Sequence, residues 1–228
     1  MNLPFSVEQF LEVFAAYNNA VWPLQVVLNV MALVAIFLAI RPSRHSDRTV
    51  SSVLGFLWLW MGAVYHIAFF APINPAAYGF GGLFILQAVL FLWSAVRNKI
   101  TYRASLGWPQ FIGGVLILYG LVLYPALGSI LGHAFPRGPS FGVPCPTTIF
   151  TFGILLFATG VPRSLLVIPA LWSVIGFTAA LTLGIQEDIG LLVSGVLGTA
   201  IILTTKPQTR TSPASESRTQ AEGGHQPK

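Results

Sequence analysis

Charged side chains are scarce in this sequence. Only 8% of its 228 residues are Asp, Glu, Lys or Arg, while 54% are hydrophobic; soluble domains carry about 25% charged residues. So few charges cannot cover a water-exposed surface, which excludes a soluble fold and places the protein in a lipid bilayer. The bases that give the net charge of +5 occur in short clusters between apolar runs, a pattern typical of membrane topology signals. No nucleic-acid partner is therefore expected.

Cysteine is almost absent as well, since Cys145 is the only one. A single cysteine excludes an intrachain disulfide and any zinc site built on cysteine pairs. The first 40 residues contain no Lys or Arg, so the basic region that opens a cleavable signal peptide is missing. The sequence also lacks a P-loop, a glycine-rich dinucleotide fingerprint and an HExxH motif. No cofactor is predicted, and an enzyme is not the expected class.

Seven apolar runs are present, and crossing a bilayer takes about 20 such residues. The predicted fold class is an all-α polytopic transmembrane helix bundle with seven spans. They cover residues 21–40, 50–71, 78–96, 111–131, 146–159, 164–183 and 189–204. None has an Asp or Glu at its centre, which argues against a proton-coupled transporter.

The positions of the basic residues predict the orientation. With seven spans, eleven of the twelve Lys and Arg residues fall on one side, and Arg137 alone falls on the other. Basic residues favour the cytoplasmic side, so the N-terminus is predicted to lie outside and the C-terminus inside. If the fifth segment did not cross, Arg163 and the basic tail would lie outside, and this favours seven spans.

The fifth segment is short, because fourteen residues make only about 21 Å of helix. Either its start is sunken below the outer surface, with buried backbone before it, or the helix continues through Gly160–Arg163. Pro146 suits the first helical position, and a residue before proline is pushed out of the α region. These preferences predict Cys145 as the N-cap, beside Thr147 and Thr148.

The two ends of the chain differ from the spans. Residues 1–20 have the pattern of an amphipathic helix that lies on the membrane surface. Ser6 and Gln9 have the spacing of a capping box at its start. Residues 205–228 are polar and almost free of apolar side chains, which predicts a disordered cytoplasmic tail.

Chemically versatile residues gather on the predicted outer side. We expect an outward-facing polar pocket there, lined by His66, His133, Cys145, Thr148 and Asp188. Ionisable residues at membrane depth usually face a cavity or a bundle interior. A soft or borderline metal such as copper or zinc would use His66, His133 and Cys145, although no metal motif spacing is present.

Structural roles compete with this interpretation. His66 would pack between helices and donate to a carbonyl, and His133 would cap the helix that ends near it. For Asp188 and its neighbour Glu187, capping the start of the last span is the alternative. Cys–His nucleophilic catalysis remains a further alternative, for which no third orienting group is identifiable.

Other small and polar side chains lie within the spans. Gln25, Asn29 and Gln87 are predicted to bond between helices or to line a path. Small residues allow close helix packing, within the chain or with a partner or second copy; they are Gly128, Gly132, Gly190, Ser194 and Gly198.

Several stretches carry a resemblance to a known family. They are "PFSVEQFLEVFAAYN", "WLWMGAVYHIAFFAPINPAA", "GHAFP", "FGVPCPTTIFTFGILL", "LLVIPALWSVIG" and "QEDIGLL". Together, and in this order, they resemble bacterial polytopic membrane proteins of the DUF6064 type, a domain of unknown function. The resemblance implies a multi-pass protein of the bacterial inner membrane and brings no activity, substrate or site residues.

Three functional hypotheses remain open at this point. The first is a small permease or a ligand-binding membrane protein that works from the outer pocket. The second is a non-transporting accessory or sensor subunit of a membrane complex. The third is a thiol-dependent membrane enzyme, or a protein that binds copper or zinc at its periplasmic face.

Overall fold

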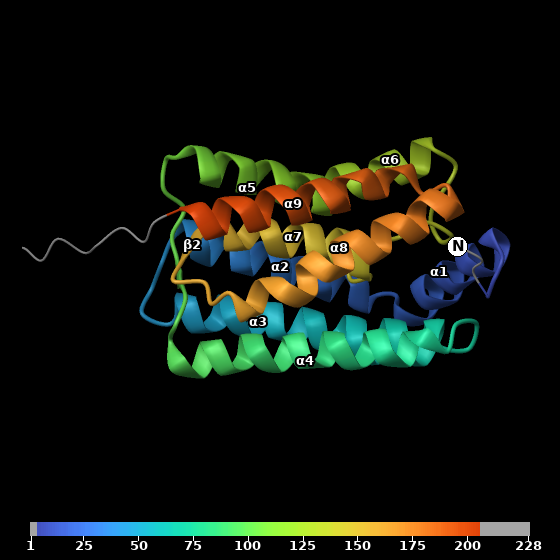
Figure 1. Ribbon diagram of the computed structural model, residues 1–228, viewed down its shortest axis with the longest axis horizontal. Coiled ribbons are helices and arrows are strands. Elements are labelled where there is room, and N and C mark those ends of the chain that lie inside the picture. Colours follow the sequence, from blue (N-terminus) through green and yellow to red (C-terminus); the bar gives the residue numbers. More distant parts are fainter. Residues whose placement is uncertain (1–3, 206–228) are drawn as a thin grey trace, which may run out of the picture.

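The computed structural model describes residues 4–205, and the predicted tail, apart from its first residue, lies outside this range. The described chain forms a bundle of helices with one short pair of strands (Figure 1). In chain order the elements are α1 (Val7–Val21), α2 (Leu24–Ile40), α3 (Ser46–Trp60), the π-helix η1 (Met61–Phe70), α4 (Ala76–Arg97), β1 (Thr101–Tyr102), α5 (Trp108–Leu118), the π-helix η2 (Tyr119–Leu123), α6 (Tyr124–Ile130), α7 (Pro144–Leu155), β2 (Ala158–Thr159), α8 (Ser164–Leu183), the 3₁₀ turn η3 (Gln186–Asp188) and α9 (Ile189–Thr204).

Five continuous helical stretches are long and apolar enough to cross a membrane. They are Ser46–Phe70, Ala76–Arg97, Trp108–Ile130, Ser164–Leu183 and Gln186–Thr204. The helices α1 and α2 form a sixth candidate, which bends by 85° at its break. Apolar side chains cover the outside of the bundle: Phe37, for example, is 61% exposed. A large exposed apolar surface is what a multi-pass membrane protein presents to lipid.

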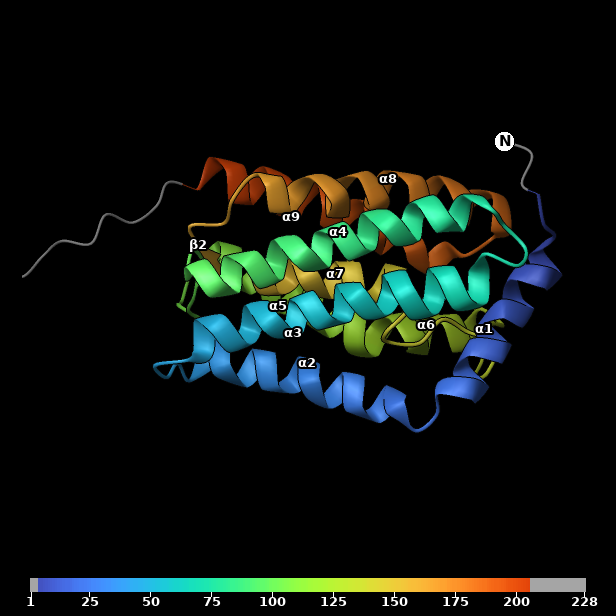
Figure 2. The same cartoon turned by 90° about the horizontal axis from the view of Figure 1, so that it is seen from below.

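The loops gather at two opposite ends of the bundle. The α1 end comprises α1 and the connections 71–75, 131–143 and 184–188. Here Asn18 donates to the carbonyl oxygens of Pro136 and Gly138, at 2.6 and 2.8 Å. Figure 2 shows α1 turned away from α2 across this end. The capping box predicted at the start of α1 is confirmed, since Ser6 and Gln9 satisfy each other's backbone N–H groups.

The basic end comprises the connections 41–45, 98–107 and 156–163. The strands β1 and β2 pair there in antiparallel register, with Thr101 opposite Thr159. Arg103 bridges to Asp47 at 2.8 Å. The strand pair joins the connection between α4 and α5 to the residues that follow α7, and the ion pair joins the same connection to α3.

Helix α7 lies at the centre of the bundle. All of its residues except Cys145 are buried, and it packs against α2, α5, α8, α9 and η2. It starts at the α1 end, where the Tyr17 hydroxyl donates to the Gly142 carbonyl at 3.3 Å, and β2 follows it at the basic end. The 12 residues of α7 suffice because protein, not lipid, surrounds both of its ends.

Both sequence-based explanations of this short segment are tested by the structure. The residues that precede α7, Phe141–Val143, are buried, so the expected buried start is confirmed. The helix does not continue through Gly160–Arg163: β2 follows it, and Gly160 has a φ of 73°.

The prediction that Cys145 is the N-cap of this helix is wrong. The N-cap is Val143, and Pro144 and Cys145 occupy the first two helical positions. The first four N–H groups of a helix have no partner within it, so Pro144 and Pro146 both fit the first turn. This tolerance outweighs the extended conformation that a following proline favours.

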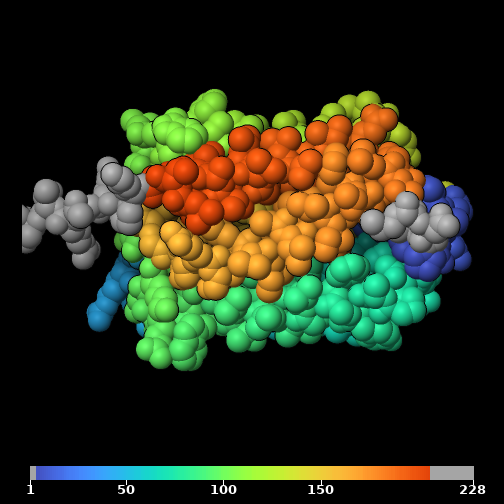
Figure 3. Space-filling view, viewed as in Figure 1, coloured from blue at the N-terminus to red at the C-terminus, as the bar shows by residue number. Residues whose placement is uncertain are grey.

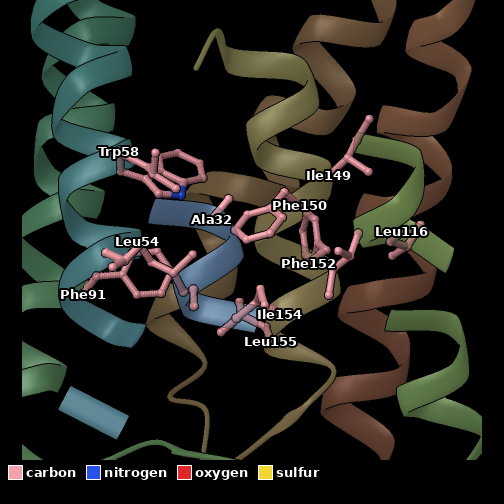
Figure 4. Close-up of a cluster of buried hydrophobic side chains, with 14 of the residues drawn as sticks. Ala32, Leu54, Trp58, Phe91, Leu116, Ile149, Phe150, Phe152, Ile154 and Leu155 are labelled. Atoms are coloured by element: carbon pink, nitrogen blue, oxygen red, sulfur yellow. The ribbon is translucent and has the colours of Figure 1, made fainter. Parts of the chain in front are cut away.

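The hydrophobic core forms where α7 meets α2, α3 and α4 (Figure 4). Trp58 is fully buried, and its indole N–H donates to the Thr151 hydroxyl at 3.1 Å. On the other side of α7, Gly113 of α5 lies close to Gly153. A Cβ on Gly113 would lie 2.7 Å from the Gly153 carbonyl oxygen. Helices α5 and α7 therefore touch through their backbones.

Small residues of α9 pack against side chains of their own chain. A Cβ on Gly190 would meet the ring of Tyr119, and a Cβ on Gly198 would meet the ring of Phe152. Ser194 lies between them and is fully buried. This face is occupied within the chain, so a second copy would have to bind elsewhere.

The other small-residue pair lies near the end of α6. Gly128 faces Glu187, whose Oε1 would lie 3.0 Å from an added Cβ. Gly132 follows the helix with a φ of 97°, a conformation that glycine adopts without strain. The spacing of Gly128 and Gly132 suggests a close contact with another helix, and neither glycine forms one.

Adjacent glycines of α5 provide a test of the packing. Gly113→Ala should lower the free energy of unfolding by about 1–3 kcal/mol, because the methyl group meets the Gly153 carbonyl. Gly114→Ala should leave it unchanged or slightly raise it, since nothing lies within 4 Å of an added Cβ. Thermal unfolding in detergent measures the difference. Equal stability of the two variants would contradict the contact between α5 and α7.

Candidate functional site

A cavity of about 310 Å³ lies at the α1 end of the bundle. Its walls come from α1, η1, α8, the first turns of α4 and α7, the end of η3 and the start of α6. Most of the lining is phenyl or aliphatic, including Phe5, Phe10 and Phe14 from the N-terminal region. A polar pocket is expected from the sequence, but the observed one is mainly apolar with a few polar groups at its base.

His66 is the most unusual of these polar groups. It lies in the π-helix η1, where the Ala71 N–H bonds to the His66 carbonyl at 2.8 Å. Its side chain is 0% exposed, and neither ring nitrogen has a hydrogen-bond partner in the described structure. The interpretation that it donates to a carbonyl is therefore wrong. A buried polar atom without a partner costs about 1–3 kcal/mol, and π-helical turns often occur at functional sites.

Aromatic rings surround the His66 imidazole. The ring centroid of Phe84 lies 4.7 Å from that of His66, and the centroid of Trp172 lies 5.1 Å away. The Trp172 indole N–H also lacks a partner among the described residues. Three buried nitrogens of these two cavity-lining residues therefore have no protein partner among the described residues.

Tyr124, Cys145 and Asp188 complete the polar side of the cavity. The Tyr124 hydroxyl donates to the Asp188 carboxylate at 2.5 Å, and the Cys145 thiol lines the cavity from the first turn of α7. Asp188 occupies the N-cap position of α9 without capping it by its side chain. The capping role suggested by the sequence is wrong for Asp188 because its carboxylate accepts from Tyr124 instead.

His133 lies away from the cavity and contacts Glu187. Its Nδ1 lies 3.1 Å from Glu187 Oε1, a side chain with no exposure. The His133 N–H bonds to the Gly128 carbonyl at 2.7 Å, which confirms that it helps to end the helix near it. Glu187 therefore pairs with His133 and does not cap α9.

The three residues suggested as metal ligands are not assembled into a site. Within residues 4–205, no group of three or more His, Cys, Asp and Glu residues lies close enough to hold a metal ion. His66 and Cys145 reach the cavity, whereas His133 does not. Thr148 is buried in α7 with an unpartnered hydroxyl and is not part of the lining.

The intramembrane amides form structural hydrogen bonds. Gln87 donates to the Leu165 carbonyl at 2.9 Å and so joins α4 to α8. Gln25 donates to Asn18 and to Ser140, at 2.5 and 2.7 Å. Asn29 donates to the Gln25 carbonyl within α2 at 2.8 Å. None of the three amides lines the cavity.

The cavity has exposed or half-buried lining residues at the α1 end, Pro4 and Asn74, and also on two helices of the bundle. Its exposed or half-buried lining residues include Ala76 and Phe80 of α4 and Thr178 and Ala179 of α8. Figure 3 shows these two helices side by side on one face of the bundle. Val174 of α8 is exposed on the apolar exterior, so an opening between these two helices would face that exterior.

Sequence reasoning missed Trp172, Tyr65 and Tyr124 as lining residues. All three lie within apolar runs, where an aromatic residue carries no signal that separates packing from ligand contact. The aromatic spacing of the N-terminal helix was visible, but it predicts a face toward lipid as readily as a cavity wall.

Comparisons with curated proteins and with solved structures gave no significant match. Residues 7–212 match the family of unknown function DUF6064, which covers nearly the whole described bundle. The order of the quoted motifs predicts the same assignment. The chain therefore belongs to the DUF6064 family.

Proposed function

We propose that this membrane protein binds a small, mainly apolar molecule that carries a hydrogen-bonding head group. The observation that carries the proposal is His66, a fully buried histidine at the base of an apolar cavity with both ring nitrogens unpartnered. A ligand that satisfies these nitrogens would offset the cost of leaving them unpaired.

The free groups define the chemistry of the head group. A neutral imidazole offers one donor and one acceptor, and the Trp172 indole offers one donor. A hydroxyl group fits this set because it both accepts and donates, and the phenyl rings of Phe5, Phe10 and Phe14 suit an aliphatic tail. A water-sized group takes up about 30 Å³, so the cavity volume of about 310 Å³ holds roughly ten such groups. This is the lower end of ordinary ligand pockets.

An opening between α4 and α8 would allow entry from the bilayer. A polar solute would have to pass exposed apolar side chains of α4 and α8, whereas a molecule dissolved in lipid already lies beside them. This favours a binding protein for a lipophilic compound over a permease for a polar solute. Transport of the bound molecule would be a later step.

The placement in the membrane is part of the proposal. Helix α7 connects the α1 end to the basic end and so acts as a seventh crossing enclosed by protein. The basic end carries Arg41, Arg44, Arg48, Arg97, Lys99, Arg103 and Arg163. By the charge rule this end lies in the cytoplasm and α1 lies outside, in the inner membrane of a bacterium.

A photoreactive probe tests the ligand class. Octanol that carries a diazirine should label η1 and α8 in protein held in lipid nanodiscs, as read by mass spectrometry of the peptides, and excess octanol should compete. His66→Phe removes both nitrogens and puts a somewhat larger aromatic ring in place of the imidazole. It should reduce labelling about tenfold, the loss expected for about 1.4 kcal/mol of hydrogen bonding. The same variant should unfold at a higher temperature, since two buried unpaired atoms are removed.

Octane with the same diazirine is the control for the head group. It should label the cavity only weakly in the parent protein. Its labelling should be just as weak in the His66→Phe variant. If octane and octanol label alike, or if His66→Phe labels as strongly as the parent, the head-group role of His66 is wrong.

Cysteine accessibility tests the orientation. In a Cys145→Ser background, an impermeant thiol reagent added to intact cells should modify Ala134→Cys at the α1 end. It should not modify Ser105→Cys at the basic end until the membrane is opened. Both positions are exposed, so the opposite pattern would reverse the proposed orientation, and labelling of both would contradict a membrane crossing by Trp108–Ile130 between them.

A further inference from the structure

A second cavity, of about 220 Å³, lies at the basic end of the bundle. Arg44, His45, Arg48 and Asn98 line it. The first three come from the start of α3, and Asn98 directly follows α4. Because α3 and α4 are packed side by side, Asn98 meets the other three residues although it is distant from them in sequence.

The two arginines carry charge that the protein does not neutralise. Among the described residues, neither Arg44 nor Arg48 forms an ion pair. The nearest acid in the chain, Asp47, is already engaged: it accepts from the Arg103 side chain at 2.8 Å and from the Tyr102 N–H at 2.9 Å. The cavity therefore presents two free guanidinium groups.

The backbone adds to this positive character. His45 is the N-cap of α3 and no side chain caps the helix, so the opening amides and the helix dipole favour an anion. Asn98 ends α4 in the left-handed conformation, with a φ of 47°. This turn places Asn98 beside the cavity directly after the last residue of α4.

The surroundings place the cavity at the edge of the apolar exterior. Trp93, Val96 and Ile40 are 53, 69 and 52% exposed. The Arg97 guanidinium lies 4.5 Å from the centroid of the Trp93 ring. Exposed tryptophan beside arginine is typical of the membrane–water interface, so the cavity lies at the depth of lipid head groups.

We propose that the cavity of Arg44, His45, Arg48 and Asn98 binds the phosphate of an anionic membrane lipid. Guanidinium groups bind phosphate oxygens in a bidentate manner, and basic pockets at the ends of membrane helices suit anionic head groups. The lipid chains would lie against the apolar exterior beside Ile40 and Val96. This site is separate from the cavity at the α1 end and does not depend on the ligand proposed there.

Native mass spectrometry of the full chain in a neutral detergent tests the proposal. Phosphatidylglycerol should bind about tenfold more tightly than phosphatidylcholine. The double variant Arg44→Gln/Arg48→Gln should weaken phosphatidylglycerol binding at least about thirtyfold, since each direct guanidinium–phosphate contact contributes at least about a factor of five. Asn98→Gly keeps the left-handed turn and the net charge, and it should weaken binding several-fold.

The matched control is Arg41→Gln/Arg163→Gln, which removes the same charge from the same end but outside the cavity. It should change binding by less than a factor of three. If the control weakens binding as much as the cavity variant, the effect is general surface charge and the proposal fails. If inorganic phosphate displaces the lipid at equal concentration, the site binds free phosphate and the proposal of a lipid ligand is wrong. Should the double arginine variant fail to fold, Asn98→Gly decides, and unchanged binding in it overturns the site.

Discussion

The burial of α7 on all sides is the constraint on which the rest of the structure depends. A helix of 12 residues cannot reach across a bilayer by itself, so other protein must cover both of its ends. The segment 131–143 and α1 cover its start, and the paired strands follow its end. The glycine contact with α5 and the hydrogen bond between Trp58 and Thr151 are the close packing that a helix without lipid contact requires.

The candidate site lies where regular helix geometry breaks down. The π-helix η1, the proline-rich start of α7 and the turn between α8 and α9 all border one cavity. In lipid, irregular backbone is tolerated only inside protein or beside a cavity. The unpartnered nitrogens of His66 and Trp172 lie at this point. The same part of the fold thus carries both the irregular backbone and the unpaired polar atoms.

The extent of the helices was predictable because hydropathy is a local property. The capping box of α1 and the buried start of α7 also followed from short-range rules. The N-cap of α7 was misplaced because the tolerance of a first helical turn for proline outweighs the effect of proline on the residue before it. Partnerships set by distant residues were missed, such as the contact of Glu187 with His133. No periodicity in the sequence indicates that η1 has π geometry or that Trp172 meets His66. These depend on how α3, α4 and α8 pack, which a single sequence does not specify.

The three phenylalanines that α1 and the short segment before it supply to the cavity have a thermodynamic consequence. A helix of 15 residues has little stability alone in water, so α1 depends on the surface beneath it for its order. A molecule in the cavity would enlarge that surface, and an ordered α1 would in turn enclose the molecule. Any such coupling is reciprocal: whatever holds α1 against the bundle also tightens binding, and whatever fills the cavity also holds α1. The order of the N-terminal helix, which lies at the end of the bundle opposite the basic end, would therefore depend on whether the cavity is filled.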